Sequence, residues 1–86
     1  MVTIDTLKLK NCGFIKVDVE GGDTAVLRGA SKTIKKHRPV IIVESVPAYE
    51  ARFGLPACAP IIFLESLGYE LVETFWVDNI LVFPRP

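Results

Sequence analysis

The sequence is poor in the residues that build cross-linked or metal-bound scaffolds. It has two cysteines, Cys12 and Cys58, and a single histidine, His37. Two cysteines without CxxC spacing exclude a disulfide scaffold and a zinc or redox motif. One histidine excludes a histidine-rich metal site. We therefore predict reduced thiols in a cytoplasmic protein that holds no metal.

Long apolar runs and an excess of one charge are also lacking. The longest apolar runs have four residues, as at 61–64, which is too short to span a bilayer. Ten basic and ten acidic residues give a net charge of zero, so no basic field attracts nucleic acid or an anionic membrane. The charge is nevertheless polarised, with +4 on residues 1–43 and −4 on residues 44–86. We expect neither a nucleic-acid nor a membrane partner.

What the chain does have is enough apolar residues for a core. Its 86 residues are 50% hydrophobic and 23% charged, a composition that excludes an intrinsically disordered chain. Because a typical domain has about 100–150 residues, the chain is long enough for one small domain only. We predict a single domain over residues 1–86.

The pattern of the first half predicts a strand, a helix and a second strand. The strands cover residues 14–19 and 40–43, and the helix runs from a cap at Asp23 or Thr24 to about residue 37. Short connections of this kind join parallel strands in a right-handed crossover. The continuous β-branched run at 40–43 is typical of a strand buried on both faces.

One face of this helix is apolar. Leu27, Ala30 and Ile34 fall on a single stripe at helical spacing, so we expect that stripe to pack on the sheet. Gly29 costs about 1 kcal/mol inside a helix, which a close approach of the helix to the sheet would explain. Pro39 forces the residue before it out of helical geometry and so ends the helix.

The second half predicts one more helix and an antiparallel hairpin. A long connection at 46–60 includes a helical turn at 48–53, and a helix follows over 60–68, from a proline to a glycine cap. Strands at 70–76 and 80–83 are joined by a short turn, which makes them an antiparallel pair. The predicted fold is α/β with a mixed sheet and the order strand, helix, strand, helix, strand, strand.

Several short segments carry a family resemblance. They are TIDTL at 3–7, FIKVDVEG at 14–21, AVLRGA at 25–30, RPVIIVE at 38–44, ESLGY at 65–69 and NILVFP at 79–84. Together they resemble the FkbM family of S-adenosylmethionine-dependent methyltransferases, and the resemblance covers nearly the whole chain. It implies a partial class I methyltransferase sheet of Rossmann-like type, of which this chain is the C-terminal half.

The resemblance also implies an activity and a limit on it. Members of the family transfer a methyl group from S-adenosylmethionine to an oxygen, and they bind this cofactor mainly through an earlier half with a glycine-rich turn. No GxGxG-like run occurs in this sequence. We therefore expect the chain alone to bind no cofactor and to be inactive, and we assign no residue to cofactor binding. The alternative is a non-enzymatic oligomerising or interaction module derived from the same fold.

Three carboxylates are the candidate catalytic residues. Asp18 and Glu20 are two apart, so they share a face at the carboxyl end of the first long strand, where ligands bind in open α/β sheets. Glu44 closes the neighbouring strand at the same edge. The resemblance places Asp18 and Glu20 near the meeting point of methyl donor and acceptor. Such groups could hold magnesium or act as acid and base; alternatively, Asp18 and Glu20 accept backbone amides at the turn.

Two other groups allow both a functional and a structural interpretation. Tyr49, Arg52 and Phe53 in the long connection could form a substrate lid or simply pack a helical turn. Cations at the end of the first helix complement the helix dipole, and no aromatic residues interleave with them to stack nucleic-acid bases. These cations are Arg28, Lys32, Lys35, Lys36 and Arg38.

The family resemblance leaves one strand without a neighbour. The strand at Phe14–Val19 is interior in a whole class I methyltransferase, but its neighbour belongs to the half that this sequence lacks. An apolar edge with unpaired backbone groups is usually covered. We therefore expect a homo-oligomer that buries this strand's edge or faces, or a complementary chain that does so.

Overall fold

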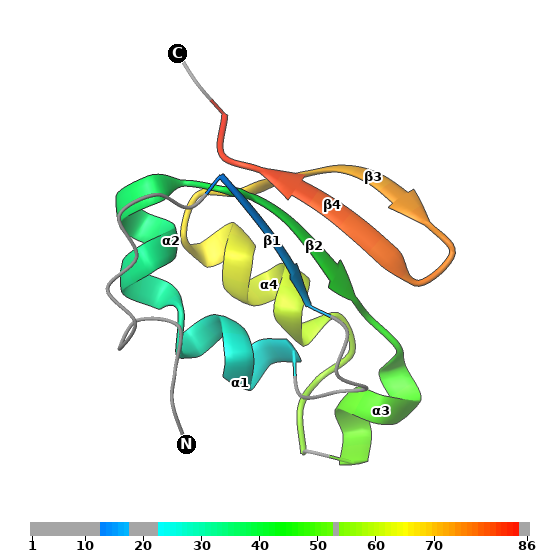
Figure 1. The fold of residues 1–86 in the computed structure, drawn as a ribbon. Coiled ribbons are helices and arrows are strands. Elements are labelled where there is room, and N and C mark those ends of the chain that lie inside the picture. Colours follow the sequence, from blue (N-terminus) through cyan, green and yellow to red (C-terminus); the bar gives the residue numbers. More distant parts are fainter. Residues whose placement is uncertain (1–12, 18–22, 53, 85–86) are drawn as a thin grey trace.

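A computed structural model describes residues 13–17, 23–52 and 54–84 of the chain. The TIDTL segment at 3–7 lies outside these residues. The elements of the described part, in chain order, are β1 (Phe14–Val17), α1 (Asp23–Arg28), α2 (Ser31–His37), β2 (Val40–Glu44), α3 (Pro47–Arg52), α4 (Ala59–Ser66), β3 (Glu70–Phe75) and β4 (Asp78–Val82) (Figure 1).

The four strands form one mixed sheet in the order β1-β2-β4-β3 (Figure 1). β1 pairs with β2 in parallel, whereas β4 pairs with both β2 and β3 antiparallel. The predicted parallel unit and the predicted C-terminal hairpin are thus both present. Within the described part of the chain β1 pairs with β2 alone and is the outermost strand on that side of the sheet.

The element order differs from the prediction because the helix expected over 23–37 is two helices. α1 ends at Arg28 and α2 begins at Ser31, with Gly29 and Ala30 in a turn between them. The N–H of Ala30 donates to Leu27 O at 3.0 Å, three residues back, in place of the α-helical bond. Glycine is a weak helix former, so the helix breaks there at little cost. α3 is a further helix, where the sequence predicted a single turn.

The predicted helix ends are confirmed. Arg38 closes α2 in the left-handed region, with φ 49°, and its N–H donates to Ile34 O at 2.8 Å. Pro39 follows and prevents the helix from continuing. Gly68 follows α4 with φ 96°, a conformation that favours glycine.

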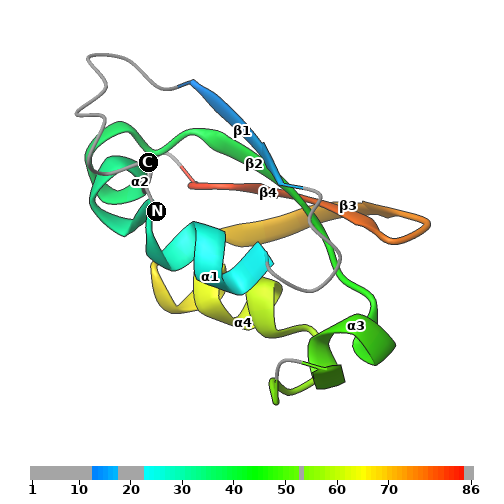
Figure 2. The same ribbon diagram turned by 60° about the horizontal axis from the view of Figure 1, so that its bottom comes forward.

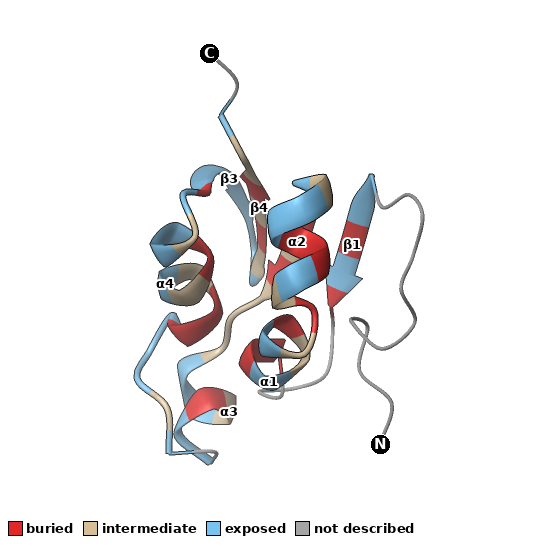
Figure 3. Ribbon diagram, turned by 90° about the vertical axis from the view of Figure 1, so that its left-hand side faces the viewer, coloured by how far each residue is buried: buried red, intermediate tan, exposed pale blue. Residues whose placement is uncertain are grey.

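The core lies between one face of the sheet and helices α1, α2 and α4 (Figures 2 and 3). The stripe of Leu27, Ala30 and Ile34 is fully buried, as predicted. Tyr69 closes the core at the amino end of β2, where its hydroxyl donates to Pro39 O at 2.7 Å. No helix of the described part is long and apolar enough to cross a membrane.

The other face of the sheet, here called the outer face, carries no helix among the described residues (Figure 2). In β2, Ile41 and Val43 are buried under the helices, but Val40 is exposed and Ile42 is half-buried. The prediction that this strand is buried on both faces was therefore wrong. A continuous apolar run does not reveal whether the second face has a cover.

The C-terminal hairpin is tighter than predicted. β4 begins at Asp78, so Trp76 and Val77 alone form the turn. Trp76 has φ 62° and is 89% exposed, which is unusual for an aromatic residue. A β-bulge between Leu71 and Glu73 interrupts the register of β3. Bulges on edge strands hinder pairing with other chains.

Candidate functional site

The carboxyl ends of β1 and β2 lie side by side, as the parallel crossover requires. Val17 is opposite Val43 in the register, so Glu44 comes one residue beyond the last pair. Asp18 and Glu20 lie outside the described residues. Their predicted grouping with Glu44 therefore stays a prediction, and Glu44 is the only one of the three carboxylates that the structure places.

The backbone at Glu44 is held by a buried carboxylate. Its N–H donates to Oδ2 of Asp23 at 3.1 Å, and the Asp23 side chain is almost completely buried. Asp23 is the first residue of α1, so this bond ties the start of α1 to the end of β2. The hydroxyl of Thr24, the other predicted cap, has no hydrogen-bond partner among the described residues. Thr24 therefore does not cap the helix.

A second buried carboxylate fixes the connection that leaves β2. Glu50 of α3 accepts a hydrogen bond from the Ser45 hydroxyl at 2.6 Å and another from the Cys58 N–H at 2.8 Å. The N–H of Ser45 donates to Val77 O at 2.9 Å. The first residue after β2 is thus bound both to α3 and to the hairpin turn.

Asn79 completes the polar network from the side of β4. Its Nδ2 donates to Val43 O at 3.3 Å and to Val77 O at 3.1 Å, and its Oδ1 accepts a hydrogen bond from the Thr74 hydroxyl at 2.9 Å. The sequence did not predict the buried roles of Glu50 and Asn79, nor the hydrogen bond between Asp23 and the Glu44 N–H. The available signal for Asn79 was a polar residue directly before the apolar run at 80–83.

The network fixes the end of β2, where Glu44 lies. The groups on Asp23, Glu50 and Asn79 are buried and bonded to the backbone, whereas Glu44 is half-buried at the end of its strand. Within the described residues no three histidine, cysteine, aspartate or glutamate side chains group as metal ligands. A single positioned carboxylate can accept a proton but does not by itself form a metal centre.

The prediction that the chain alone binds no nucleotide cofactor is not tested by the residues that the structure describes. Backbone approach to such a ligand needs glycines in the turn after a parallel strand. Gly13 precedes β1, Gly29 separates α1 from α2, and Gly54 and Gly68 follow α3 and α4. None of these four glycines follows β1 or β2, whereas Gly21 and Gly22, which follow β1 in the sequence, lie outside the described residues.

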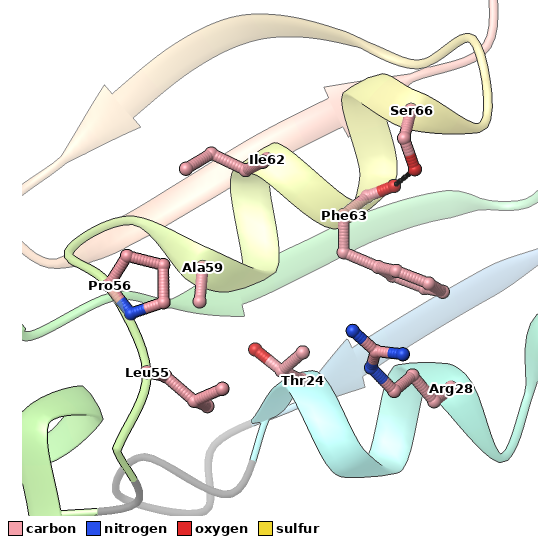
Figure 4. Close-up of a pocket in the computed structure, with 8 residues that line it drawn as sticks. All are labelled: Thr24, Arg28, Leu55, Pro56, Ala59, Ile62, Phe63 and Ser66. Carbon is pink, nitrogen blue, oxygen red and sulfur yellow. Dashed lines mark hydrogen bonds between the residues drawn. The ribbon is translucent and has the colours of Figure 1, made fainter.

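A pocket of about 230 Å³ lies between α1 and α4 (Figure 4). Its walls are mainly apolar, and the buried Thr24 hydroxyl lies in one of them. The Arg28 guanidinium lies over the Phe63 ring, 5.4 Å from its centroid. None of the residues around the pocket is a predicted catalytic carboxylate. The pocket is lined by Thr24, Arg28, Leu55, Pro56, Ala59, Ile62, Phe63 and Ser66.

The remaining candidates lie in the helices. Lys35 and Lys36 lie in the last turn of α2, where cations complement the helix dipole, as predicted. In α3 the Arg52 guanidinium lies 5.1 Å from the centroid of the Tyr49 ring. Phe53 lies outside the described residues, so the predicted lid is untested.

Comparison with known proteins gives one match. The family model described as the methyltransferase FkbM domain matches residues 1–71 of the chain. Neither curated proteins nor solved structures give a match.

Proposed function

Since the chain belongs to the FkbM family of S-adenosylmethionine-dependent methyltransferases, we propose that it forms the outer half of such a domain. It supplies acceptor-side residues for methyl transfer to an oxygen, and it acts with a glycine-rich half on another polypeptide segment. The family match over residues 1–71 is the observation that carries this proposal. The position of β1 also supports it, because β1 is the outermost strand among the described residues and a strand of the glycine-rich half can pair at its outer edge.

The proposed task of the carboxyl edge is proton transfer. S-adenosylmethionine supplies the methyl group when it is bound. The acceptor hydroxyl then loses its proton to a carboxylate, and Glu44 is our candidate base together with Asp18 and Glu20. Support comes from the fixed backbone at Glu44, since a base must be held within hydrogen-bond reach of the proton that it accepts.

The test is calorimetric titration with S-adenosylhomocysteine. We expect no binding by the chain alone, and micromolar binding after addition of a polypeptide that carries the glycine-rich half of an FkbM methyltransferase. Binding by the chain alone would overturn the division into two halves. An associated pair of polypeptides that still does not bind the ligand would overturn the role as an outer half.

A proline variant tests whether the β1 edge is the junction. The Val40 N–H donates to Gly13 O at 3.0 Å, so by strand alternation the N–H of Lys16 points away from β2, toward the outer edge of β1. Lys16→Pro removes that donor and leaves the bonds to β2 in place. We expect it to abolish association with the glycine-rich half, whereas the control Lys16→Ala keeps association. Equal binding by both variants would place the junction elsewhere.

The alternative function is a non-enzymatic interaction module. It is favoured by the apolar side chains that the outer face leaves exposed, such as Phe14 at 55% and Phe75 at 66%. A module of this kind would bind a partner but would gain no affinity for S-adenosylhomocysteine in any mixture. The same titration therefore separates the two functions.

A further inference from the structure

The strand register defines the middle of the outer face. Lys16 is opposite Ile42, Ile42 is opposite Ile80, and Ile80 is opposite Glu73. These four residues form one row across β1, β2, β4 and β3. The row has a cation at one side, two half-buried isoleucines in the centre and a carboxylate at the other side.

The neighbouring rows extend this arrangement. Toward the amino end of β2, Val40 is opposite Phe14 of β1. In the same part of the sheet, Val82 of β4 is opposite Glu70 of β3. Val40, Ile42, Ile80 and Val82 thus form an apolar strip along the two central strands. Glu70 and Glu73 border this strip on the β3 side.

The strip also has acidic residues at one end, where β2 ends and β4 begins. Glu44 is opposite Asp78, which is opposite Phe75. The described part of the outer face therefore has four carboxylates and a single lysine around an apolar centre. Both copies in a face-to-face dimer would contribute the same excess of carboxylates, so like charges oppose such a dimer.

We propose that the outer face binds a basic amphipathic helix. The apolar stripe of this helix lies along the strip of β2 and β4, and its lysines or arginines reach Glu70 and Glu73 on one side and Asp78 at the end. Helix on sheet is the usual way to bury an open sheet face, and opposite charges fix the orientation. The inference rests on the proposed function, because the helix would belong to the polypeptide that completes the domain.

The experiment uses synthetic peptides of about 18 residues, the length of five helical turns. One peptide combines a leucine stripe with lysines, a second has glutamates in place of the lysines, and a third has the lysine composition in scrambled order. Each is titrated into the 86-residue chain by calorimetry. We expect the amphipathic lysine peptide to bind at least tenfold more tightly than either control. Equal binding of the scrambled peptide would overturn the proposal.

Charge reversal locates the binding surface. The double variant Glu70→Lys with Glu73→Lys should weaken binding of the lysine peptide at least tenfold. Glu65→Lys, a reversal at an exposed position of α4 on the other side of the sheet, should leave it unchanged. If both affect binding equally, the attraction is non-specific and the proposal fails. Far-UV circular dichroism shows whether each variant is folded.

The outcomes are separable from those of the proposed function. Peptide binding requires no S-adenosylhomocysteine, so a completed domain that binds this ligand while the chain ignores every peptide would overturn the helix inference alone. Sedimentation of the free chain shows whether a second copy of the chain occupies the outer face instead. A stable dimer that dissociates in the Glu70→Lys and Glu73→Lys variant would assign the outer face to a second copy and also overturn the inference.

Discussion

The buried carboxylate of Glu50 accepts a hydrogen bond from the backbone N–H of Cys58 at 2.8 Å. Its other oxygen accepts the Ser45 hydroxyl at 2.6 Å. The side chain is only 2% exposed, so these two bonds replace the water that the carboxylate loses on folding. One residue of α3 thereby joins the end of β2 to the start of α4.

Glu50→Ala should lower the free energy of unfolding by about 2–4 kcal/mol, because it leaves the Cys58 N–H and the Ser45 hydroxyl without their partner. Glu50→Gln should cost only about 1 kcal/mol, since the amide can accept from one group and donate to a reversed hydroxyl. Urea denaturation measures both. Equal losses would mean that the negative charge matters more than the hydrogen bonds. Glu65→Gln, at an exposed position, is the control.

Gly68→Ala should destabilise the protein by about 1–3 kcal/mol. The backbone at Gly68 has φ 96°, and an added Cβ would lie 2.9 Å from Cε2 of Phe83. Gly54→Ala isolates the backbone effect, because Gly54 has φ 69° but no atom within 4 Å of the added carbon. Gly13→Ala should change thermal stability little, because no atom lies within 4 Å of the added carbon there either. If all three variants melt alike, neither strain nor crowding matters at Gly68.

Thr24→Val should raise the free energy of unfolding by about 1 kcal/mol, because it replaces a buried hydroxyl that has no partner among the described residues. Thr24 is only 4% exposed, and valine has nearly the same shape. Thr74→Val is the comparison at an exposed position: it removes the hydroxyl that bonds to Asn79 and should lower stability. Chemical denaturation measures the free energy of unfolding of both variants. A loss at Thr24 as large as that at Thr74 would show that the hydroxyl is satisfied in solution.

The sequence was sufficient to predict those parts of the fold that depend on local chemistry. Alternation and β-branching located the strands, and the residues around Pro39 and Gly68 located two helix ends. The break at Gly29 was not predicted, because one glycine inside an apolar stripe is compatible with either a continuous or a divided helix. The apolar run of β2 likewise carries no information about whether its second face is covered.

The candidate site was predictable only in part. The edge position of Glu44 follows from topology, since parallel strands end at one side of a sheet. The roles of Glu50 and Asn79 depend on contacts between residues that are distant in space until the chain folds, such as Asn79 with Val43 O. A polar residue in an apolar segment signals a buried partner, but it does not identify that partner.

Glu44→Gln, made in the completed domain, should lower the rate of methyl transfer by about 10²–10⁴-fold, the usual contribution of a general base. The amide keeps the shape of the side chain but cannot accept the proton of an acceptor hydroxyl at neutral pH. We expect kcat to fall while KM for the acceptor changes little, because the lost interaction belongs to the transition state. Binding of S-adenosylhomocysteine should be unchanged. Asp18→Asn and Glu20→Gln, assayed in parallel, show which carboxylate of the edge is the base, and Glu65→Gln on α4 is the control. Full activity of all three edge variants would exclude the carboxylates as proton acceptors and leave them the structural role of holding the strand ends.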